Sequence, residues 1–257
     1  MGMKFPVFLG AAFLCFALAE MVQAQQKSSD GIWQEIDVAR ITNHRERTIV
    51  PQAYRTLRLN KSALQQRLSQ APMEFTEAAR NSEVVVTMPM RDGEFHRFRI
   101  EESPIMAPEL AAKFPEIKTY RGQGIDDRTA TIRFDVTPTG FHAQVISTQG
   151  TVYVDPYAKG DTENYISYFK RDLRKDASYE CLVGAAETGA GVSIKKAQMT
   201  VPMVVPPNGA TLVTYRLALA ATAEYTAAAG GTAAAMARMT TSLNRVNGIY
   251  ERDSHCV

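Results

Sequence analysis

The chain reads VVVTMPMRDGEFHRFRI from residue 84 to residue 100. Two runs rich in β-branched and aromatic residues, 84–90 and 94–100, flank the dipeptide Asp92-Gly93. Aspartate and glycine tolerate the positive φ angles of a tight turn, so the pattern predicts a β-hairpin. The hairpin in turn indicates that this part of the chain forms a β-rich, antiparallel domain.

Further strands are predicted at short intervals after the hairpin. Residues 129–136, 141–147 and 151–155 are rich in apolar residues and are separated by turn signals such as Gln149-Gly150. This spacing is typical of an antiparallel meander, to which residues 165–169 are a candidate addition.

Residues 129–136 alternate between apolar and polar side chains. In a strand such alternation points successive side chains to opposite faces, which places Ile132 and Phe134 in the core. Arg133 and Asp135 fall on the other face, where we expect them to face water.

Two short helices are predicted among the strands. Asn60 is a good N-cap, and Leu64 and Leu68 share one face of the helix that would follow it. Residues 108–114 lie between prolines, and Pro115 ends this second helix because proline lacks a backbone N–H.

The segment before these elements is harder to interpret. Residues 25–50 are polar and irregular, and their apolar anchors are Trp33, Ile36 and Val38. We expect these anchors to hold the segment against the main body, ahead of a short strand at residues 54–59.

The charge of the chain identifies no partner. Lysine, arginine, aspartate and glutamate make up 22% of the residues, and the net charge is +2. Arg45, Arg47, Arg55 and Arg58 follow one another closely, but Glu46 and apolar residues interrupt the series. A nucleic-acid-binding protein more often shows a continuous basic stripe, so we interpret these arginines as a solvated face and expect no nucleic acid.

The first 24 residues resemble a secretory signal peptide. Lys4 precedes an apolar run over residues 5–19, and Ala24 follows as a small residue suited to signal peptidase. The run is shorter than the roughly 20 apolar residues of a membrane span. We therefore expect a secreted protein, extracellular or periplasmic, without a stable membrane span.

A composition change divides the mature chain. Residues 184–192 are rich in glycine and alanine, and three prolines follow at positions 202, 206 and 207. Such segments are typical of linkers. The predicted division is a signal peptide at 1–24, a β-rich domain at 25–188, a flexible linker at 189–210 and a final part at 211–257.

The final part has the pattern of a strand and a helix. Residues 212–221 alternate as a strand, and an apolar stripe at helical spacing follows, consisting of Met236, Met239, Leu243, Val246 and Tyr250. This stripe needs a sheet or another helix to cover it. One strand and one helix cannot enclose a core, so we expect residues 211–257 to be the start of a larger, truncated α/β domain.

No catalytic motif is present in the sequence. His-Glu-x-x-His, Gly-x-Ser-x-Gly and a phosphate-binding glycine-rich loop are all absent. We interpret His96 and His142 as surface or rim residues. We interpret the acidic pairs Glu101-Glu102 and Asp126-Asp127 as ordinary carboxylates of a strand and a loop. Cys181 is a possible zinc ligand through its thiolate, but a cysteine without a role is the simpler interpretation.

Five segments together resemble the reprolysin or adamalysin family of secreted zinc metalloproteases, in the form of bacterial precursors. RFRIEESP (97–104), YRGQG (120–124) and TVYVDP (151–156) are similar to the propeptide of that family. YRLA (215–218) and NRVNGIYERD (244–253) are similar to the first strand and helix of its catalytic domain. The fold class implied is α+β, with a β-rich antiparallel propeptide followed by an incomplete metzincin-like strand and helix.

The resemblance also implies a role. Propeptides of this family assist folding and hold the enzyme latent, in some members through a cysteine that occupies the zinc position, for which Cys181 is the candidate by location. Lys195 and Lys196 are a plausible maturation site. The zinc-binding histidines of the family have no counterpart in residues 1–257, so the chain itself holds no cofactor, although the intact family uses zinc, and we predict no proteolytic activity.

The expected partner is the catalytic domain of the same or a related metalloprotease. Two alternatives remain open at this stage. The chain could be a stand-alone extracellular module whose β domain binds or inhibits a protease or another partner in trans. It could also be an unrelated extracellular β-sandwich adhesin, for which short strands and turns alone would suffice.

Overall fold

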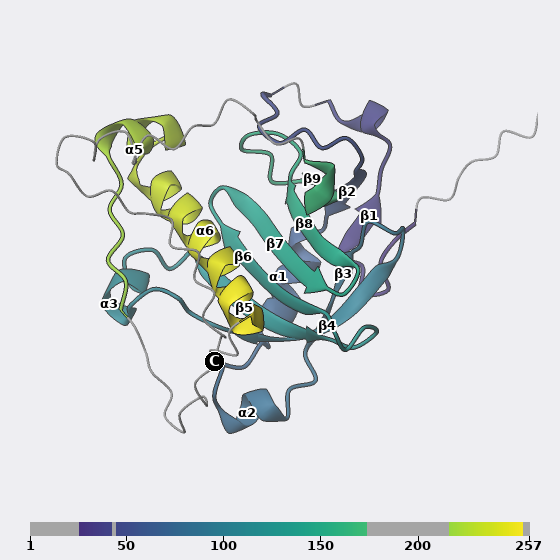
Figure 1. The fold of residues 1–257 in the computed structure, drawn as a ribbon, viewed down its shortest axis with the longest axis horizontal. Coiled ribbons are helices and arrows are strands. Elements are labelled where there is room, and N and C mark those ends of the chain that lie inside the picture. Colours follow the sequence, from purple (N-terminus) through teal and green to yellow (C-terminus); the bar gives the residue numbers. More distant parts are fainter. Residues whose placement is uncertain (1–25, 43–44, 174–215, 254–257) are drawn as a thin grey trace, which may run out of the picture.

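The computed structural model describes residues 26–42, 45–173 and 216–253 of the chain. Within them, nine strands form one antiparallel sheet in the order β1-β2-β9-β8-β7-β6-β5-β4-β3 (Figure 1). The strands are β1 (Trp33–Glu35), β2 (Arg55–Leu59), β3 (Val85–Pro89), β4 (Phe95–Glu102), β5 (Lys118–Gly124), β6 (Thr131–Thr137), β7 (Gly140–Ser147), β8 (Gly150–Pro156) and β9 (Asn164–Phe169). The β-rich antiparallel architecture is therefore confirmed.

The local predictions from residues 54–169 are largely confirmed. β3 and β4 form the predicted hairpin, with Pro89 opposite Phe95 across the turn. Helix α1 (Lys61–Leu68) begins at Asn60, whose side chain accepts a hydrogen bond from the Ala63 backbone N–H. Helix α3 (Pro108–Ala111) is shorter than predicted.

Strand β5 was not predicted, because its two glycines lower strand propensity. The structure shows why glycine is needed at both positions. A Cβ on Gly122 would lie 2.6 Å from the Arg99 carbonyl oxygen, and a Cβ on Gly124 would overlap the Asp127 carbonyl oxygen. The two glycines thus allow neighbouring backbone segments to approach closely at this strand.

The sheet curves until its two edges nearly meet. Trp33, in β1, donates from its indole Nε1 to the Thr87 carbonyl oxygen of β3 at 3.0 Å. Just before β1, the Asp30 carboxylate accepts hydrogen bonds from the Thr87 backbone N–H and hydroxyl, each at 2.7 Å. From β9, the Ser167 hydroxyl donates to the Pro89 carbonyl oxygen at 2.7 Å. Side chains therefore bridge the seam where no strand ladder forms.

Arg55 also lies at this seam, so its assignment to a solvated face was wrong. Its side chain is 5% exposed and forms an ion pair with Glu35 at 3.1 Å. The guanidinium also donates to the carbonyl oxygens of Met90 and Glu94, at 2.6 and 2.9 Å. The arginine is buried because it satisfies backbone acceptors at the turn of the β3–β4 hairpin.

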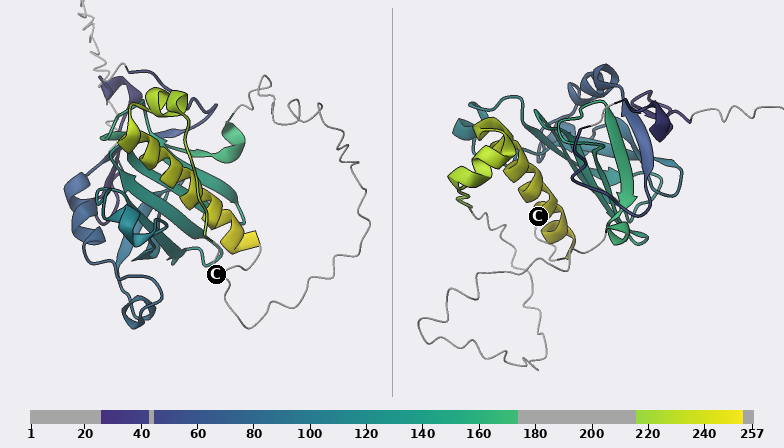
Figure 2. Two further views of the ribbon diagram at one scale, coloured as in Figure 1. Left: turned by 90° about the vertical axis from the view of Figure 1, so that its left-hand side faces the viewer. Right: turned by 90° about the horizontal axis from the view of Figure 1, so that it is seen from above.

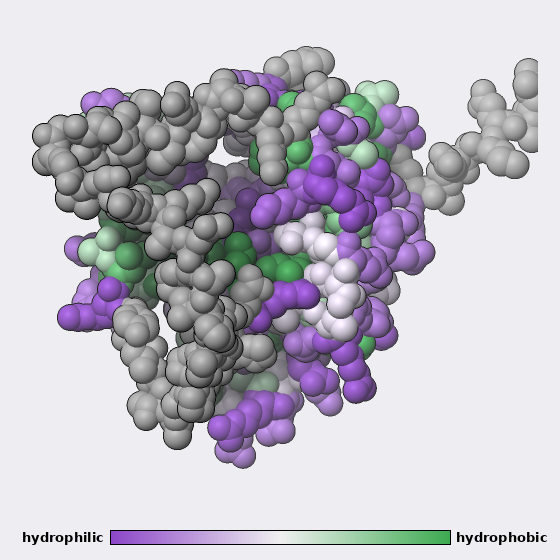
Figure 3. All heavy atoms as spheres, viewed as in Figure 1, coloured by the Kyte–Doolittle hydropathy of each residue, from purple (hydrophilic) through white to green (hydrophobic). Residues whose placement is uncertain are grey.

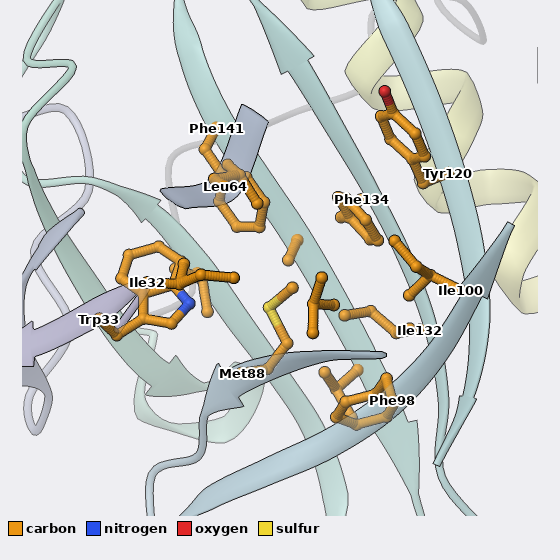
Figure 4. Packing of buried hydrophobic residues seen from close by; sticks show 14 of the residues in the cluster. Ile32, Trp33, Leu64, Met88, Phe98, Ile100, Tyr120, Ile132, Phe134 and Phe141 are labelled. Atoms are coloured by element: carbon orange, nitrogen blue, oxygen red, sulfur yellow. The ribbon is translucent and has the colours of Figure 1, made fainter. Parts of the chain in front are cut away.

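The hydrophobic core fills the inside of the curved sheet (Figure 4). Trp33 packs edge-on against Phe141 and Tyr165, with ring centroids 5.3 and 5.6 Å away. Leu64 and Leu68 of α1 are buried in the same cluster. Ile132 and Phe134 lie inside as the alternation of β6 predicted.

Helices α5 (Ala223–Ala229) and α6 (Thr232–Asp253) lie together on the outer side of the sheet, as the views in Figures 1 and 2 show. The predicted terminal helix is therefore confirmed. The strand predicted over residues 212–221 is not formed at residues 216–221, which have no regular secondary structure, and its first four residues lie outside the described part. Leu217 and Leu219 are 69% and 51% exposed there, because no neighbouring strand pairs with this segment in the described part of the chain.

Three short helices complete the described structure: η1 (Val38–Arg40), α2 (Glu77–Arg80) and η2 (Lys170–Asp172). Val38 begins η1 and is 41% exposed, so it is not the anchor that was predicted, whereas Trp33 and Ile36 are buried. Hydrophilic residues dominate the described surface on the right of Figure 3. Among the helices of the described residues, none combines the length and hydropathy needed to cross a bilayer.

Candidate helix-docking interface

Helix α6 contacts the sheet through its small and polar side. The helix residues that are buried are Ala235, Ala237, Thr240, Thr241, Asn244 and Gly248. The predicted apolar stripe does not coincide with this face: Val246 and Tyr250 are 41% and 63% exposed, and Met236, Met239 and Leu243 are only half-buried. The hydrophobic pattern therefore identified the helix correctly but not the side on which it packs.

The sheet meets α6 with a polar surface, which we call the docking face. It lies on the outer side of β6, β7 and β8 and consists of Arg133, Asp135, His142, Gln144, Tyr153 and Asp155. The prediction that Arg133 and Asp135 face water is wrong, because α6 covers them and leaves the two residues 5% and 1% exposed.

The first contact of the docking face is centred on Arg133. Its Nε donates to a carboxylate oxygen of Glu251 at 3.0 Å, and a second bond from its Nη2 makes the ion pair bidentate. Its Nη1 donates to the Ser103 hydroxyl at 2.8 Å. Such paired geometry is the strong form of an arginine–carboxylate interaction, so it fixes the C-terminal end of α6.

Asn244 binds the sheet backbone itself. Its side-chain Nδ2 donates to the carbonyl oxygen of Phe134 at 2.9 Å, and the residue is 1% exposed. Its Oδ1 lies 3.4 Å from Arg133 Nη1. An apolar side chain here would leave that strand carbonyl without this donor, so the position favours an amide.

The second contact joins Asp135, His142 and Thr241. The Thr241 hydroxyl donates to Asp135 Oδ1 at 2.8 Å, and His142 Nδ1 lies 3.0 Å from the same oxygen. The His142 side chain is 14% exposed, so it is a largely covered residue with a partner and not a free surface histidine.

The third contact pairs Asp155 with Arg245. Arg245 Nη2 donates to Asp155 Oδ1 at 2.6 Å, and the Tyr168 hydroxyl donates to the other carboxylate oxygen at 2.7 Å. The guanidinium also lies 4.7 Å from the centre of the Tyr153 ring. Burial alone would lower the pKa of Arg245, but the nearby carboxylates, Asp155 first and then Asp135, outweigh it and raise that pKa. The guanidinium therefore stays charged under the helix.

Gly248 lets the helix approach the sheet closely. A Cβ at this position would lie 3.0 Å from Arg133 Cγ and 3.2 Å from Gln144 Oε1. Glycine costs about 1 kcal/mol of helix propensity relative to alanine. A glycine inside this long helix is therefore explained by the contact and not by the helix.

The packing between the helices and the docking face is incomplete. A hollow of 390 Å³ opens beside the C-terminal end of α6 and is lined by Arg133, Gln144 and Glu251, among others. A second hollow of 510 Å³ lies between α5, the middle of α6 and the docking face. Gln144 Oε1 and Arg245 Nε are buried without a hydrogen-bond partner in the described structure. This polar, incompletely packed contact resembles an interface between domains more than a hydrophobic core.

The site residues predicted from the sequence lie elsewhere. Ala24, Cys181, Lys195 and Lys196 all lie outside the described residues, so their predicted roles stay predictions. Within residues 26–42, 45–173 and 216–253, no group of three or more His, Cys, Asp or Glu side chains is placed to hold a metal ion.

The acidic pairs behave as expected of ordinary carboxylates. Glu101 and Glu102 point apart, to Arg121 and Lys118 respectively. Asp126 binds Arg97, and this hydrogen bond lowers the pKa of the Asp126 carboxyl.

Sequence reasoning missed the docking face, although a signal was present. Polar residues occupy alternate positions in the middle of β6 and β7, at Arg133, Asp135, His142 and Gln144. Polar residues also recur at helical spacing on the last helix, at Thr241, Asn244 and Glu251. Two polar faces with charges of both signs can pair, and comparing them would have suggested the contact.

Buried tyrosines predict a loss of stability at alkaline pH. Burial raises the pKa values of Tyr120, Tyr165 and Tyr168 above the ordinary value of about 10. The folded state thus keeps protons that the unfolded state releases, so stability is complete below about pH 10 and falls as pH rises further. In a tyrosinate absorbance titration with circular dichroism in parallel, we expect these three of the ten tyrosines to ionise only on unfolding. Ionisation of all ten near pH 10 in a folded protein would contradict this.

Comparison with known proteins finds no family model, no curated protein and no solved structure that matches this chain.

Proposed function

We propose that the chain is the N-terminal part of a secreted zinc metalloendopeptidase precursor. In this proposal the nine-stranded sheet is the propeptide, and α5 and α6 begin the catalytic domain. The propeptide assists folding by holding α6 in place, and it contributes to latency by keeping that helix from its final partners.

The observation that carries the proposal is where the family-like segments meet. NRVNGIYERD (244–253) supplies Asn244, Arg245, Gly248 and Glu251, which all contact the docking face. TVYVDP (151–156) supplies Asp155, the partner of Arg245. The segments that resemble propeptide and catalytic domain thus contact each other through charged pairs in which the sheet partner is buried and the helix partner is partly exposed.

The orientation of α6 fits this role. The sheet takes the small, polar side of the helix, and Val246, Ile249 and Tyr250 stay exposed on the other side. An exposed apolar stripe on a helix is suited to a further layer of structure. A propeptide that contacts only the polar side of α6 leaves the apolar side of the helix available for the core of the domain that the helix begins.

The proposal involves zinc only because the metalloprotease family that the chain resembles uses it. Its zinc motif, with three histidines and a glutamate, does not occur in residues 1–257, so no step of catalysis is assigned to this chain. Cys181 as a latency cysteine and Lys195-Lys196 as the maturation site stay predictions within the proposal.

The first test is to translate the DNA downstream of codon 257 in all three frames. We expect His-Glu-x-x-His-x-x-Gly-x-x-His in one of them, and its absence would contradict the protease assignment. A precursor that carries the motif is then expressed with Arg133→Met. Loss of the Glu251 pair should lower the yield of active protease about fivefold or more, because the bidentate pair that fixes the C-terminal end of α6 is removed.

Arg58→Met is the matched control for this experiment. Arg58 is an exposed arginine of strand β2, and the described structure shows no ion pair for it, so the yield should not change. Equal yields from the Arg133 variant and the wild type would contradict a folding role of the sheet.

A further inference from the structure

The sheet does not need α6 to complete its core. The residues of its hydrophobic cluster all come from the part of the chain between Ile32 and Phe169, and neither α5 nor α6 contributes one. Removing the helix would therefore uncover polar side chains and not the core. A surface of this kind can exist without its partner, as a binding site must.

Recognition of the helix depends on defined positions. Ala237, Thr241, Asn244 and Gly248 form the contact line: Ala237 is fully buried, Thr241 and Asn244 hydrogen-bond the sheet, and Gly248 lies too close to the sheet for a Cβ. Val246 and Ile249 lie on the other side of the helix and are 41% and 39% exposed. The contact line therefore defines a helix class: small and polar on one side, with an arginine and a glutamate at its edges.

The charges also fix the direction of the helix. Asp155 on the sheet binds Arg245, and Arg133 on the sheet binds Glu251. A helix docked in the reverse direction would bring Glu251 toward Asp155 and Arg245 toward Arg133. Like charges at close range disfavour that arrangement, so the docking face selects one orientation.

From these observations we infer that the docking face is a helix receptor, which keeps α5–α6 bound non-covalently after the chain between the sheet and these helices is cut. Once that fragment is displaced, the same face binds in trans a separate helix that presents Ala-x3-Thr-x2-Asn-Arg-x2-Gly-x2-Glu. This inference does not depend on the protease assignment, since it follows from the contacts alone.

The experiment uses the full chain with a site-specific protease sequence inserted in the predicted linker, residues 189–210. After cleavage, size-exclusion chromatography shows whether the two fragments elute together. Trp33, the single tryptophan, is fully buried in the sheet, so its fluorescence reports whether the sheet stays folded. We expect co-elution at low salt and displacement of the cleaved fragment by excess synthetic peptide 222–253, but not by a scrambled peptide of the same composition.

Variants on the helix test the recognition without altering the sheet. Gly248→Leu should abolish co-elution, and because leucine favours helix over glycine, lost helicity cannot account for the result. Arg245→Met should weaken binding about thirtyfold or more, since it leaves the Asp155 carboxylate buried without its partner. Val246→Ala, at a 41% exposed position on the other side of the same helix, should change binding less than about twofold.

Two results would overturn the inference. Separation of the wild-type fragments with native Trp33 fluorescence would show that the docking face does not hold the helix by itself. Equal binding by the Gly248→Leu and wild-type helices would show that the residues of the contact line do not determine binding. Either result leaves the downstream DNA test, and hence the protease proposal, to be decided separately.

Discussion

Replacing Trp33 with alanine is expected to lower the free energy of unfolding by about 3–5 kcal/mol, the range for deleting a buried tryptophan side chain. The indole is 0% exposed and packs edge-on against Phe141 and Tyr165. It also loses the hydrogen bond to Thr87 across the seam of the sheet. The measurement is urea denaturation followed by far-ultraviolet circular dichroism.

Val38→Ala is the matched control for this substitution. Both residues were predicted as anchors of the N-terminal segment, but Val38 is 41% exposed. Its replacement should change stability by no more than about 0.5 kcal/mol. Similar losses for the two variants would mean that Trp33 is not a core residue.

Replacing Asp30 with alanine is expected to destabilise the protein by about 2–4 kcal/mol. Its carboxylate accepts hydrogen bonds from the Ser28 hydroxyl, the Ile32 backbone N–H and two donors of Thr87. Thr87 is 2% exposed, so its donors would be left buried and unpaired, at about 1–3 kcal/mol each before relaxation.

Asp30→Asn separates hydrogen bonding from charge. The amide keeps one acceptor oxygen and should therefore retain part of the stability that alanine loses. The measurement is the same urea denaturation for both variants. A loss of less than about 0.5 kcal/mol for the alanine variant would show that this link does not hold the seam closed.

Local patterns predicted the inner side of the sheet well. The alternation of residues 129–136 placed Ile132 and Phe134 in the core, and Asp92-Gly93 marked the turn of the hairpin. These features depend on neighbours in sequence, because strand periodicity and turn chemistry are local properties. The same alternation was wrong about Arg133 and Asp135, since it cannot show whether a distant helix covers the outer face.

Local sequence patterns also failed to identify which face of helix α6 is buried. Its apolar stripe predicted a helix correctly, but the rule that the buried face is apolar fails where a polar surface is the partner. Arg55 was misjudged for a related reason, because an arginine in a short basic series looks solvated. Its partners are carbonyl oxygens at the turn of a distant hairpin, which only the closed sheet brings near.

The strand order has a consequence for the time course of folding. Strand β2 pairs with β9, and β2 is the one strand of the described sheet that pairs with β1, so the earliest strands join the sheet only after the last one has been made. Contacts between segments so distant along the chain slow folding, because a long loop must close before they form. During synthesis α6 emerges after all nine strands, so the helix can dock only when every strand of its binding surface has already been made.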